Sequence, residues 1–204
     1  MLPPIIDPVD VALLKSELNE KTFLRNTNRG NNEIYVVNNE CAPNVLREIG
    51  RLREVSFRAV GGGSGTECDL DHFDLDDKAC FQLVVWNPEA DEIIGGYRFT
   101  KWSMASFHEN GQPYVNTEHL FDFSQKFIDE YFPYCIEMAR AFVQPKYQSA
   151  QMGRKALFAL DNLWDGIGGL VATDPSVKYL SGKVTIYSSS PELSRKAMVY
   201  YLDK

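Results

Sequence analysis

Two apolar runs separated by five turn-forming residues place the strongest constraint on how this chain folds. The runs are Phe81–Trp86 and Glu92–Trp102, and the sequence Asn-Pro-Glu-Ala-Asp at positions 87–91 joins them. Apolar segments of strand length on either side of such a turn are typical of an antiparallel β-hairpin. We therefore expect a hairpin over residues 81–102.

Further strands and helices are predicted around this hairpin. Pro43 lies near the start of the strongest helix signal, which Gly61–Gly63 end. Ser124 is expected to cap a short helix that runs to Tyr131, and Cys135–Val143 is predicted to be a buried strand. The other expected elements are a helix opened by Asp7 and Pro8, strands over Glu33–Val37 and Lys183–Ser188, a helix over about Met152–Ile167 with Ala156, Leu157, Leu160, Leu163, Trp164 and Ile167 inside, and a final helix from Ser190-Pro191-Glu192.

Composition restricts the class of protein. The chain has 204 residues, 44% of them hydrophobic and 24% charged, which suits a soluble protein with one substantial core. Its net charge of −7 disfavours a general binder of nucleic acid or of anionic membranes. Without a signal-peptide pattern or a membrane-spanning run, we expect a cytoplasmic protein. Four cysteines and three histidines without ligand spacing predict reduced thiols and no metal site.

An acidic cluster follows the predicted basic helix. Asp69, Asp71 and Asp74 are spaced D-x-D-x-x-D, and so dense a cluster needs a cation, a bound amine or arginines to offset its repulsion. Arginines on either side of it are Arg53, Arg58, Arg98 and Arg140. A solvated acidic turn is the alternative for the aspartates, and a solvated helix face paired with glutamates is the alternative for the helix arginines.

The glycine-rich segment Gly61–Gly65 precedes the acidic cluster. No Lys-Ser/Thr follows it and no helix opens there, so the sequence argues against a phosphate-binding P-loop. We interpret the segment as a mobile lid beside a site.

Four short motifs occur in one order along the chain. They are Arg53-x-x-x-Phe57, the Asp69/Asp71/Asp74 cluster, Gly96-Tyr97-Arg98-Phe99 and Glu137-Met138-Ala139-Arg140. They resemble acyl-homoserine-lactone synthases, and still more the haemolysin-labelled relatives of those synthases. That group includes the acyl carrier protein-dependent N-acyltransferases of ornithine- and glycine-lipid synthesis. The resemblance covers roughly Arg47–Tyr201.

This resemblance implies a GNAT-like acyltransferase fold. The expected architecture is mixed α/β with α+β character, and a central, mostly antiparallel, splayed sheet is flanked by helices. Residues 1–204 would form one domain, with residues 1–32 as an N-terminal helical extension. One or two strands that usually follow the helix at Glu192–Tyr201 would be missing, so a longer chain or a partner would cover the sheet edge.

Two departures from the family pattern affect the expected substrates. The tryptophan that follows the Arg-x-x-x-Phe element in the lactone synthases is absent, and the glycine loop stands in its place. This disfavours S-adenosylmethionine and favours the aminolipid branch. The usual acetyl-CoA loop is poorly matched by residues 148–154, which disfavours acetyl-CoA as the donor.

Amide formation from a thioester requires a deprotonated amine, a stabilised oxyanion and an exit for the thiolate. Glu137 is the candidate for the base or for its water relay, because its apolar surroundings would raise its pKa toward the working pH. Glu137 and Arg140 would point to opposite faces of a regular strand. The resemblance implies a bulge that turns both toward one cleft and frees N–H groups for an oxyanion. A buried structural ion pair is the alternative role of Glu137 and Arg140.

The remaining candidates are assigned to substrate binding. Asp71 and Asp74 would hold an ammonium group, while Arg98 and Arg140 orient them or grip a carboxylate, which suits an amino-acid acceptor. The full set of expected site residues is Glu137, Arg140 and Asp71 as catalytic, and Arg53, Phe57, Asp69, Asp74 and Arg98 as substrate-binding.

The acyl donor is expected at the start of the helix after Gln151. Free N–H groups there, with Gly153, Arg154 and Lys155, suit the phosphate of a phosphopantetheine arm, although a basic first turn of a surface helix is equally consistent. An acidic carrier protein would need one basic patch made of Arg47, Arg51, Lys146, Arg154 and Lys155. Tyr200 or Tyr201 would protonate the thiolate, or would serve packing alone.

These observations favour an N-acyltransferase that moves a long-chain acyl group from acyl carrier protein, or from CoA, to the amine of an amino acid for aminolipid synthesis. No permanently bound cofactor and no nucleic-acid partner are expected, whereas peripheral contact with the inner face of the membrane is compatible with the product. A lactone-type signal synthase and a membrane-lytic haemolysin are the alternatives. Acyl length, the amino acid and the oligomeric state stay open.

Overall fold

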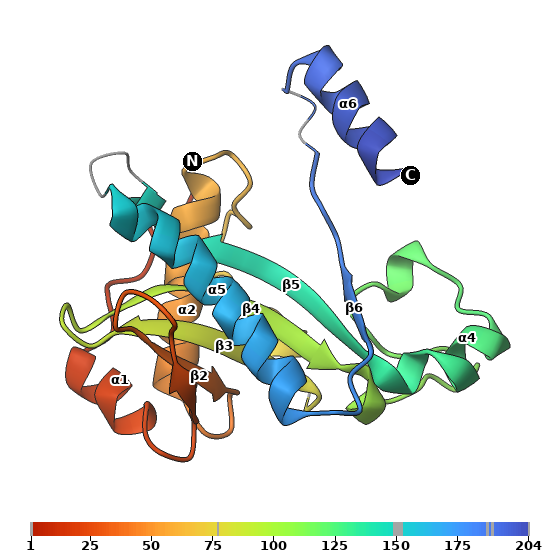
Figure 1. The fold of residues 1–204 in the computed structure, drawn as a ribbon, viewed down its shortest axis with the longest axis horizontal. Coiled ribbons are helices and arrows are strands. Elements are labelled where there is room, and N and C mark those ends of the chain that lie inside the picture. The colour runs from red at the N-terminus through yellow and green to blue at the C-terminus, as the bar shows by residue number, and fades with distance from the viewer. Residues whose placement is uncertain (1, 77, 149–152, 187, 189, 204) are drawn as a thin grey trace.

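The structure is a computed structural model that describes residues 2–76, 78–148, 153–186, 188 and 190–203, with backbone alone at residues 154 and 155. Its strands form one six-stranded sheet with helices on both faces (Figure 1). The strands are β1 (Phe23–Asn26), β2 (Glu33–Val37), β3 (Cys80–Asn87), β4 (Glu92–Lys101), β5 (Cys135–Val143) and β6 (Tyr179–Gly182). The α-helices are α1 (Val11–Glu17), α2 (Pro43–Arg58), α3 (His72–Leu75), α4 (Gln125–Glu130), α5 (Arg154–Thr173) and α6 (Glu192–Leu202), and short 3-10 turns cover Trp102–Met104, Glu118–Leu120, Phe132–Tyr134 and Pro145–Gln148.

The strands lie in sequence order, and only the last pair is parallel. Each of the pairs from β1–β2 to β4–β5 is antiparallel, while β6 runs parallel to β5 after the crossover through α5. The β5–β6 pairing ends at Met138 and Gly182, although β5 continues to Val143. The two strands therefore separate beyond Met138, which gives the splayed, mostly antiparallel sheet that the sequence predicts.

Two hydrophobic layers cover opposite faces of the sheet. On one face, α2 packs Val45, Ile49 and Leu52 against residues of β2 and β3 such as Val37 and Val84. On the other face, α5 contributes Ala159, Leu163 and Leu170, which pack with a second set of apolar strand residues. Alternate residues of a strand point to opposite faces, so the fully buried central strands read as continuous apolar runs.

A third apolar cluster closes one end of the sheet. Trp102 stacks on Phe132, with ring centroids 4.8 Å apart, and Val115 and Cys135 are buried beside them. This aromatic cluster lies next to Glu137, because Trp102 directly follows the strand residues that pair with Ile136 and Glu137. It excludes water from that part of β5.

Most of the expected elements are present, and three need correction. Asp10, and not Asp7, caps α1, because its carboxylate accepts the N–H of Ala12. Strand β1 was not predicted, and its presence places part of the expected helical extension inside the sheet. The last strand is Tyr179–Gly182, so the strand predicted over Lys183–Ser188 is wrong and its first residues continue as non-strand chain.

The outer side of α5 is also more apolar than the sequence pattern predicts. Leu157, Leu160 and Trp164 are 69%, 56% and 62% exposed, so only part of the expected interior is inside. The final helix α6 forms as expected but stands away from the sheet at the end of an extended segment (Figure 1). Its described side chains are mostly exposed.

Candidate active site

The acidic segment is folded around its own aspartates. Asp71 Oδ1 accepts hydrogen bonds from the N–H groups of Phe73 and Asp74 at 3.0 and 3.2 Å. Asp74 Oδ2 in return accepts the N–H of Asp71 at 3.1 Å. This reciprocal capping box explains the D-x-x-D part of the motif, because the first turn of α3 leaves N–H groups that need acceptors.

Two buried arginines from separate elements converge on Asp74. Arg53 of α2 donates from Nη1 to Asp74 Oδ1 at 3.0 Å and from Nη2 to the side chain of Gln82 on β3. Arg98 of β4 donates from Nη1 to Asp74 Oδ2 at 3.1 Å and to Asp71 Oδ1 at 2.7 Å. Both oxygens of Asp74 are thus paired with cations, which offsets the cost of burying its charge.

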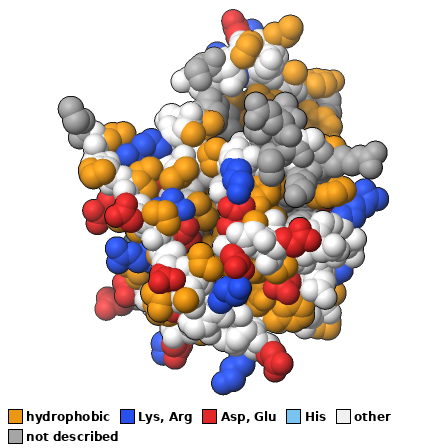
Figure 2. Space-filling view, turned by 90° about the vertical axis from the view of Figure 1, so that its left-hand side faces the viewer, with side chains coloured by type: hydrophobic (Ala, Val, Ile, Leu, Met, Phe, Trp, Pro, Cys, Tyr) orange, Lys and Arg blue, Asp and Glu red, His pale blue; other side chains and the backbone are white. Residues whose placement is uncertain are grey.

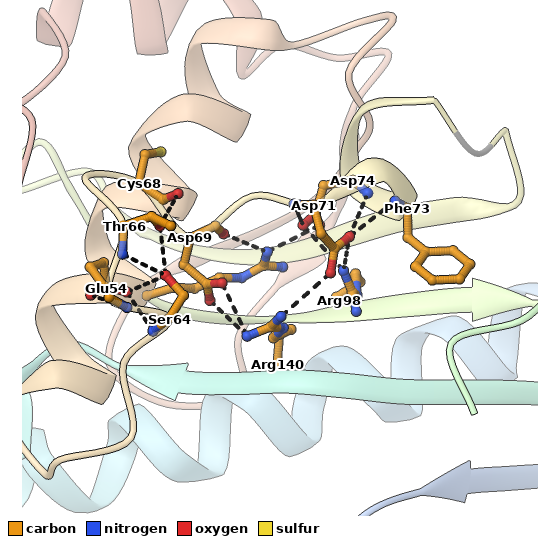
Figure 3. Close-up of polar contacts among 12 residues, drawn as sticks. Glu54, Ser64, Thr66, Cys68, Asp69, Asp71, Phe73, Asp74, Arg98 and Arg140 are labelled. Carbon is orange, nitrogen blue, oxygen red and sulfur yellow. Dashed lines mark hydrogen bonds and ion pairs between the residues drawn. The ribbon is translucent and has the colours of Figure 1, made fainter. Parts of the chain in front are cut away.

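A third arginine binds the two aspartates that Arg53 leaves unpaired. Arg140 of β5 lies 3.0 Å from Asp69 and 3.4 Å from Asp71 (Figure 3). The aspartate–arginine network therefore contains three carboxylates and three guanidinium groups, and its formal charge is zero. Its members are Asp69, Asp71, Asp74, Arg53, Arg98 and Arg140.

Burial divides this network into an inner and an outer part. The side chains of Arg53 and Asp74 are 0% and 1% exposed, whereas those of Arg140 and Asp71 are 33% and 29% exposed. The sequence predicts substrate contacts for Arg53 and Asp74, but neither side chain reaches the surface. They lie beneath the site and hold Arg98, so their expected role as direct ligands does not fit the structure.

The electrostatics follow the same division. Burial raises the pKa of Asp71, but the hydrogen bond and charge of Arg98 more than offset it and lower this pKa to about 2. Burial raises the pKa of Asp69, and the partly exposed Arg140 only moderates that rise. Asp71 is therefore held as a carboxylate at neutral pH, which agrees with its position between two arginines.

A cleft of about 460 Å³ opens beside the outer part of the network. It lies where the pairing of β5 with β6 ends, and residues of β4 and β5, the end of α2 and the chain that follows β6 form its walls. Its described lining comprises Phe57, Gly62, Arg98, Asn116, Met138, Ala139, Arg140, Ala141, Lys183 and Thr185. Phe57, Arg98 and Arg140 of the expected site thus line one cavity, and Asp69 and Asp71 adjoin it through Arg140.

A β-bulge brings Arg140 to this cleft. Arg98 pairs with Ala139 and Gly96 pairs with Phe142, so Arg140 and Ala141 together face the single residue Tyr97. Arg140 has a φ of 50°, in the left-handed region that side chains other than glycine adopt at a cost. The bulge turns Arg140 to the face that carries Arg98, which confirms the bulge expected on this strand.

Glu137 lies on the same face, deeper in the sheet. It is 1% exposed, and its Oε2 accepts the indole N–H of Trp102 at 3.1 Å. Its Oε1 has no hydrogen-bond partner among the residues that the structure describes. Burial raises the pKa of Glu137, although the Trp102 N–H, the nearby hydroxyl of Thr117 and the positive charges of Lys183 and Arg98 counteract part of the rise. An unpaired carboxylate oxygen with a raised pKa is the arrangement that a general base requires.

The glycine-rich loop is anchored, in contrast to the expected lid. Glu54 of α2 is buried, and its carboxylate accepts the N–H groups of Ser64 and Gly65 at 2.9 and 3.1 Å and the Ser64 hydroxyl at 2.7 Å (Figure 3). A Cβ on Gly63 would lie 2.8 Å from Glu54 Oε1. The loop therefore fits tightly over the end of α2, and this attachment does not suit a mobile lid.

The expected donor site lies largely outside the described residues. Gly153 is exposed, with a φ of 53°, and directly precedes α5. The side chains of Arg154 and Lys155 are outside the described part of the chain, so their role stays a prediction. Tyr200 and Tyr201 are exposed on α6 and are not among the described residues that line the cleft.

Two members of the expected basic patch for a carrier protein form ion pairs, and the side chains of Arg154 and Lys155 lie outside the described part of the chain. Arg51 pairs with Glu48 at 2.5 Å, and Lys146 pairs with Glu92 at 2.6 Å. Figure 2 shows Lys and Arg interspersed with Asp and Glu over the face in view, without one large basic area among the described side chains.

Several residues that line the cleft or adjoin it were not predicted from the sequence. Asn116, Lys183 and Thr185 lie in irregular segments, where no periodic signal marks which side chains face inward. Gln82 is different, because a lone amide inside an apolar strand needs a buried polar partner, and it pairs across the hairpin with Arg98. That signal was available in the sequence.

Neither a metal cluster nor a membrane-crossing helix is found in the part of the chain that the structure covers. No group of three or more His, Cys, Asp or Glu side chains is placed to hold an ion among the described residues. In the same residues, every helix is too short or too polar to cross a bilayer.

Comparisons with known proteins find relatives of similar sequence. Glycine N(alpha)-acyltransferases of Phocaeicola vulgatus and Bacteroides thetaiotaomicron are 50% and 52% identical over 200 residues, which is 98% of this chain. The chain spans only 61% and 59% of the length of these relatives. A solved integron cassette protein from the mobile metagenome of V. cholerae is 13% identical, with a TM-score of 0.41 over 86% of this chain and 85% of that one.

The family model described as an acetyltransferase (GNAT) domain matches residues 52–157, from the middle of α2 into α5. This match covers more than half of the chain and contains the network, the bulge and Glu137. The chain therefore belongs to the GNAT acetyltransferase-domain family.

Proposed function

We propose that this protein transfers a long-chain acyl group from a thioester to the α-amine of glycine, forming N-acylglycine. The observation that carries the proposal is Glu137, buried on β5 directly before Met138, which lines the cleft where β5 and β6 separate; one carboxylate oxygen of Glu137 has no hydrogen-bond partner among the described residues. Relatives that share half of its sequence and are named glycine N(alpha)-acyltransferases support glycine as the acceptor.

The proposed reaction requires three proton transfers. The ammonium group of glycine first gives a proton to the carboxylate of Glu137, which yields the nucleophilic amine. The amine nitrogen then attacks the thioester carbonyl carbon and forms a tetrahedral intermediate. When the C–S bond breaks, one of the two N–H protons goes to the departing thiolate and the other stays on the amide nitrogen, and Glu137 later releases its proton to solvent. The products are an amide and a free thiol.

The aspartate–arginine network serves this reaction by fixing positive charge at the cleft. Arg98 and Arg140 line the cleft, while Asp71 and Asp69 hold them in place. Because these donors are oriented before substrate binds, they stabilise a developing oxyanion or a bound carboxylate without reorganising. Arg53 and Asp74 support Arg98 from below and do not touch the substrate.

The acyl donor is proposed to be an acyl carrier protein or CoA thioester, and the product an intermediate of aminolipid synthesis. Apolar groups of Phe57, Met138, Ala139 and Ala141 line the cleft beside the polar side chains. This mixture suits a fatty acyl chain that meets a small charged acceptor.

The test is product analysis with purified protein, isotopically labelled glycine and two donors, acyl carrier protein and CoA, each loaded with C2 to C18 acyl chains. Labelled N-acylglycine that depends on the enzyme and is lost in Glu137→Gln supports the proposal. If the protein instead forms acyl lactones when S-adenosylmethionine is supplied, it is a signal synthase and the proposal fails. Liposome leakage without any acylated product would overturn it in favour of a lytic protein.

A further inference from the structure

The extended chain that follows β6 brings one lysine into the cleft. Ser181 of β6 pairs in register with Glu137 of β5, so their side chains lie on the same face of the sheet. Lys183 follows two residues later, and the two-residue period of extended chain returns it to that face. Lys183 lines the cleft and lies close enough to Glu137 for its charge to act on that carboxyl.

The other two cations of the cleft already have partners. Arg98 binds Asp71 and Asp74, and Arg140 binds Asp69 and Asp71. Lys183, by contrast, is exposed and forms no salt bridge with any carboxylate among the residues that the structure describes. The aspartate–arginine network is electrically balanced, so Lys183 is the cation of the described cleft that no salt bridge to a described residue engages, and its charge acts on the neighbouring Glu137.

We infer that Lys183 binds the carboxylate of the acceptor and thereby selects an α-amino acid over a simple amine. The inference rests on the proposed function and adds a specificity-determining residue to it. Glycine carries its ammonium and carboxylate groups on one carbon, so the two protein groups that bind them must lie close together. Glu137 and Lys183 are neighbours on one sheet face with opposite charges, which matches that substrate. With the carboxylate on Lys183, the ammonium group is directed toward the unpaired oxygen of Glu137.

The test compares glycine with glycinamide, which keeps the amine and lacks the carboxylate. Lys183→Gln should raise the KM for glycine by roughly 10-fold to 100-fold, because a hydrogen bond between charged groups is lost, and should lower the ratio of glycine to glycinamide kcat/KM by about the same factor. Rates are measured at a pH where Glu137 is ionised in both proteins. Lys183→Arg should restore most of the discrimination. Lys178→Gln is the matched control, since Lys178 is exposed on the same segment but contacts the Tyr134 ring outside the cleft.

Several results would overturn the inference while leaving the proposed acyl transfer intact. One is an unchanged ratio of glycine to glycinamide activity in Lys183→Gln. Another is a raised KM for the acyl donor alone, which would assign Lys183 to the donor phosphate. Calorimetric titration with glycine gives a readout that needs no turnover. If wild-type protein forms no product but binds glycine, and Lys183→Gln weakens that binding, the inference stands and the proposed reaction fails. Equal binding of glycine by the wild-type protein and Lys183→Gln, or binding by neither, overturns the inference.

Discussion

Arg140 contacts Asp69, 71 positions earlier in the sequence, with an Nη1–Oδ1 distance of 3.0 Å, from a backbone conformation that side chains rarely adopt. The β-bulge on β5 makes this contact possible, because a regular strand would direct the Arg140 side chain to the opposite face. The ion pairs of Arg140 therefore offset a strained backbone at the edge of the cleft.

This relationship predicts an unusual order of stability for two substitutions at one position. Arg140→Ala and Arg140→Gly both remove the ion pairs, but only glycine adopts a φ of 50° without steric cost. Arg140→Gly should therefore be the more stable variant by about 1 kcal/mol in urea unfolding, the reverse of the order expected in a regular strand. Ala139→Gly, on the same strand outside the bulge, is the control and should be destabilising. Equal stability of the two Arg140 variants would contradict the bulge.

Glu137→Gln should separate activity from stability. Loss of the base is expected to lower kcat by at least about 10²-fold, because glutamine cannot accept the proton. The same change removes a buried charge with one unpaired oxygen, so the variant should be at least as stable as wild type. Kinetics and thermal unfolding at pH 8 check both parts. A variant that unfolds, or that keeps wild-type turnover, would remove Glu137 from the mechanism.

The raised pKa of Glu137 also fixes the pH dependence. The carboxylate is the active form, so kcat/KM for glycine should fall as the pH drops through the raised pKa, with an inflection above the ordinary glutamate value of 4.5. Protonation of Glu137 is favoured in the folded state, so its stabilising contribution is present at low pH and is lost as the pH rises through the folded pKa. The stability advantage of Glu137→Gln should therefore develop as the pH rises from the ordinary glutamate value to the raised pKa, and should be complete above it. An activity profile that is flat down to pH 4.5 would contradict the assignment.

The sequence predicted the sheet better than it predicted the roles of its charged residues. Apolar runs and turn residues predict β2 to β5 and α2. Strands buried on both faces appear in the sequence as continuous apolar runs, and the buried side of α2 appears as apolar residues at helical spacing. β1 was not predicted, because its four residues, Phe-Leu-Arg-Asn, do not alternate between apolar and polar. The strand predicted over Lys183–Ser188 was displaced, because a short edge strand depends on its parallel partner more than on its own composition.

The local sequence pattern does not show which of the charged side chains are buried. Arg53 and Arg140 both bind aspartates of the acidic cluster, yet one is fully buried under β3 and the other lines the cleft. That difference arises from long-range packing of α2 on the sheet. The exposed positions of α5 show the same limit, since Leu157 and Trp164 have helical spacing and still face outward.

Asp74 should behave as a structural residue. Asp74→Ala leaves Arg53 and Arg98 buried without their shared carboxylate, which should lower the free energy of unfolding by about 3–5 kcal/mol. Asp76→Ala, two residues later on the surface, is the matched control and should change stability by less than about 0.5 kcal/mol. Urea unfolding followed by tryptophan fluorescence measures both. A fully stable Asp74→Ala with reduced glycine affinity would return Asp74 to the substrate-binding set.

Two glycines of α5 provide a test of how this helix lies on the sheet. A Cβ on Gly166 would lie 2.6 Å from Leu83 of β3, whereas a Cβ on the exposed Gly168 meets nothing within 4 Å. Gly168→Ala should therefore raise stability by roughly 0.5–1 kcal/mol, because alanine lowers the entropy of the unfolded chain and favours helix. Gly166→Ala should lower stability despite the same gain in propensity, since Leu83 is fully buried and has no space to move. Chemical denaturation of both variants decides it: if both were stabilised equally, α5 would not pack on β3 through Gly166.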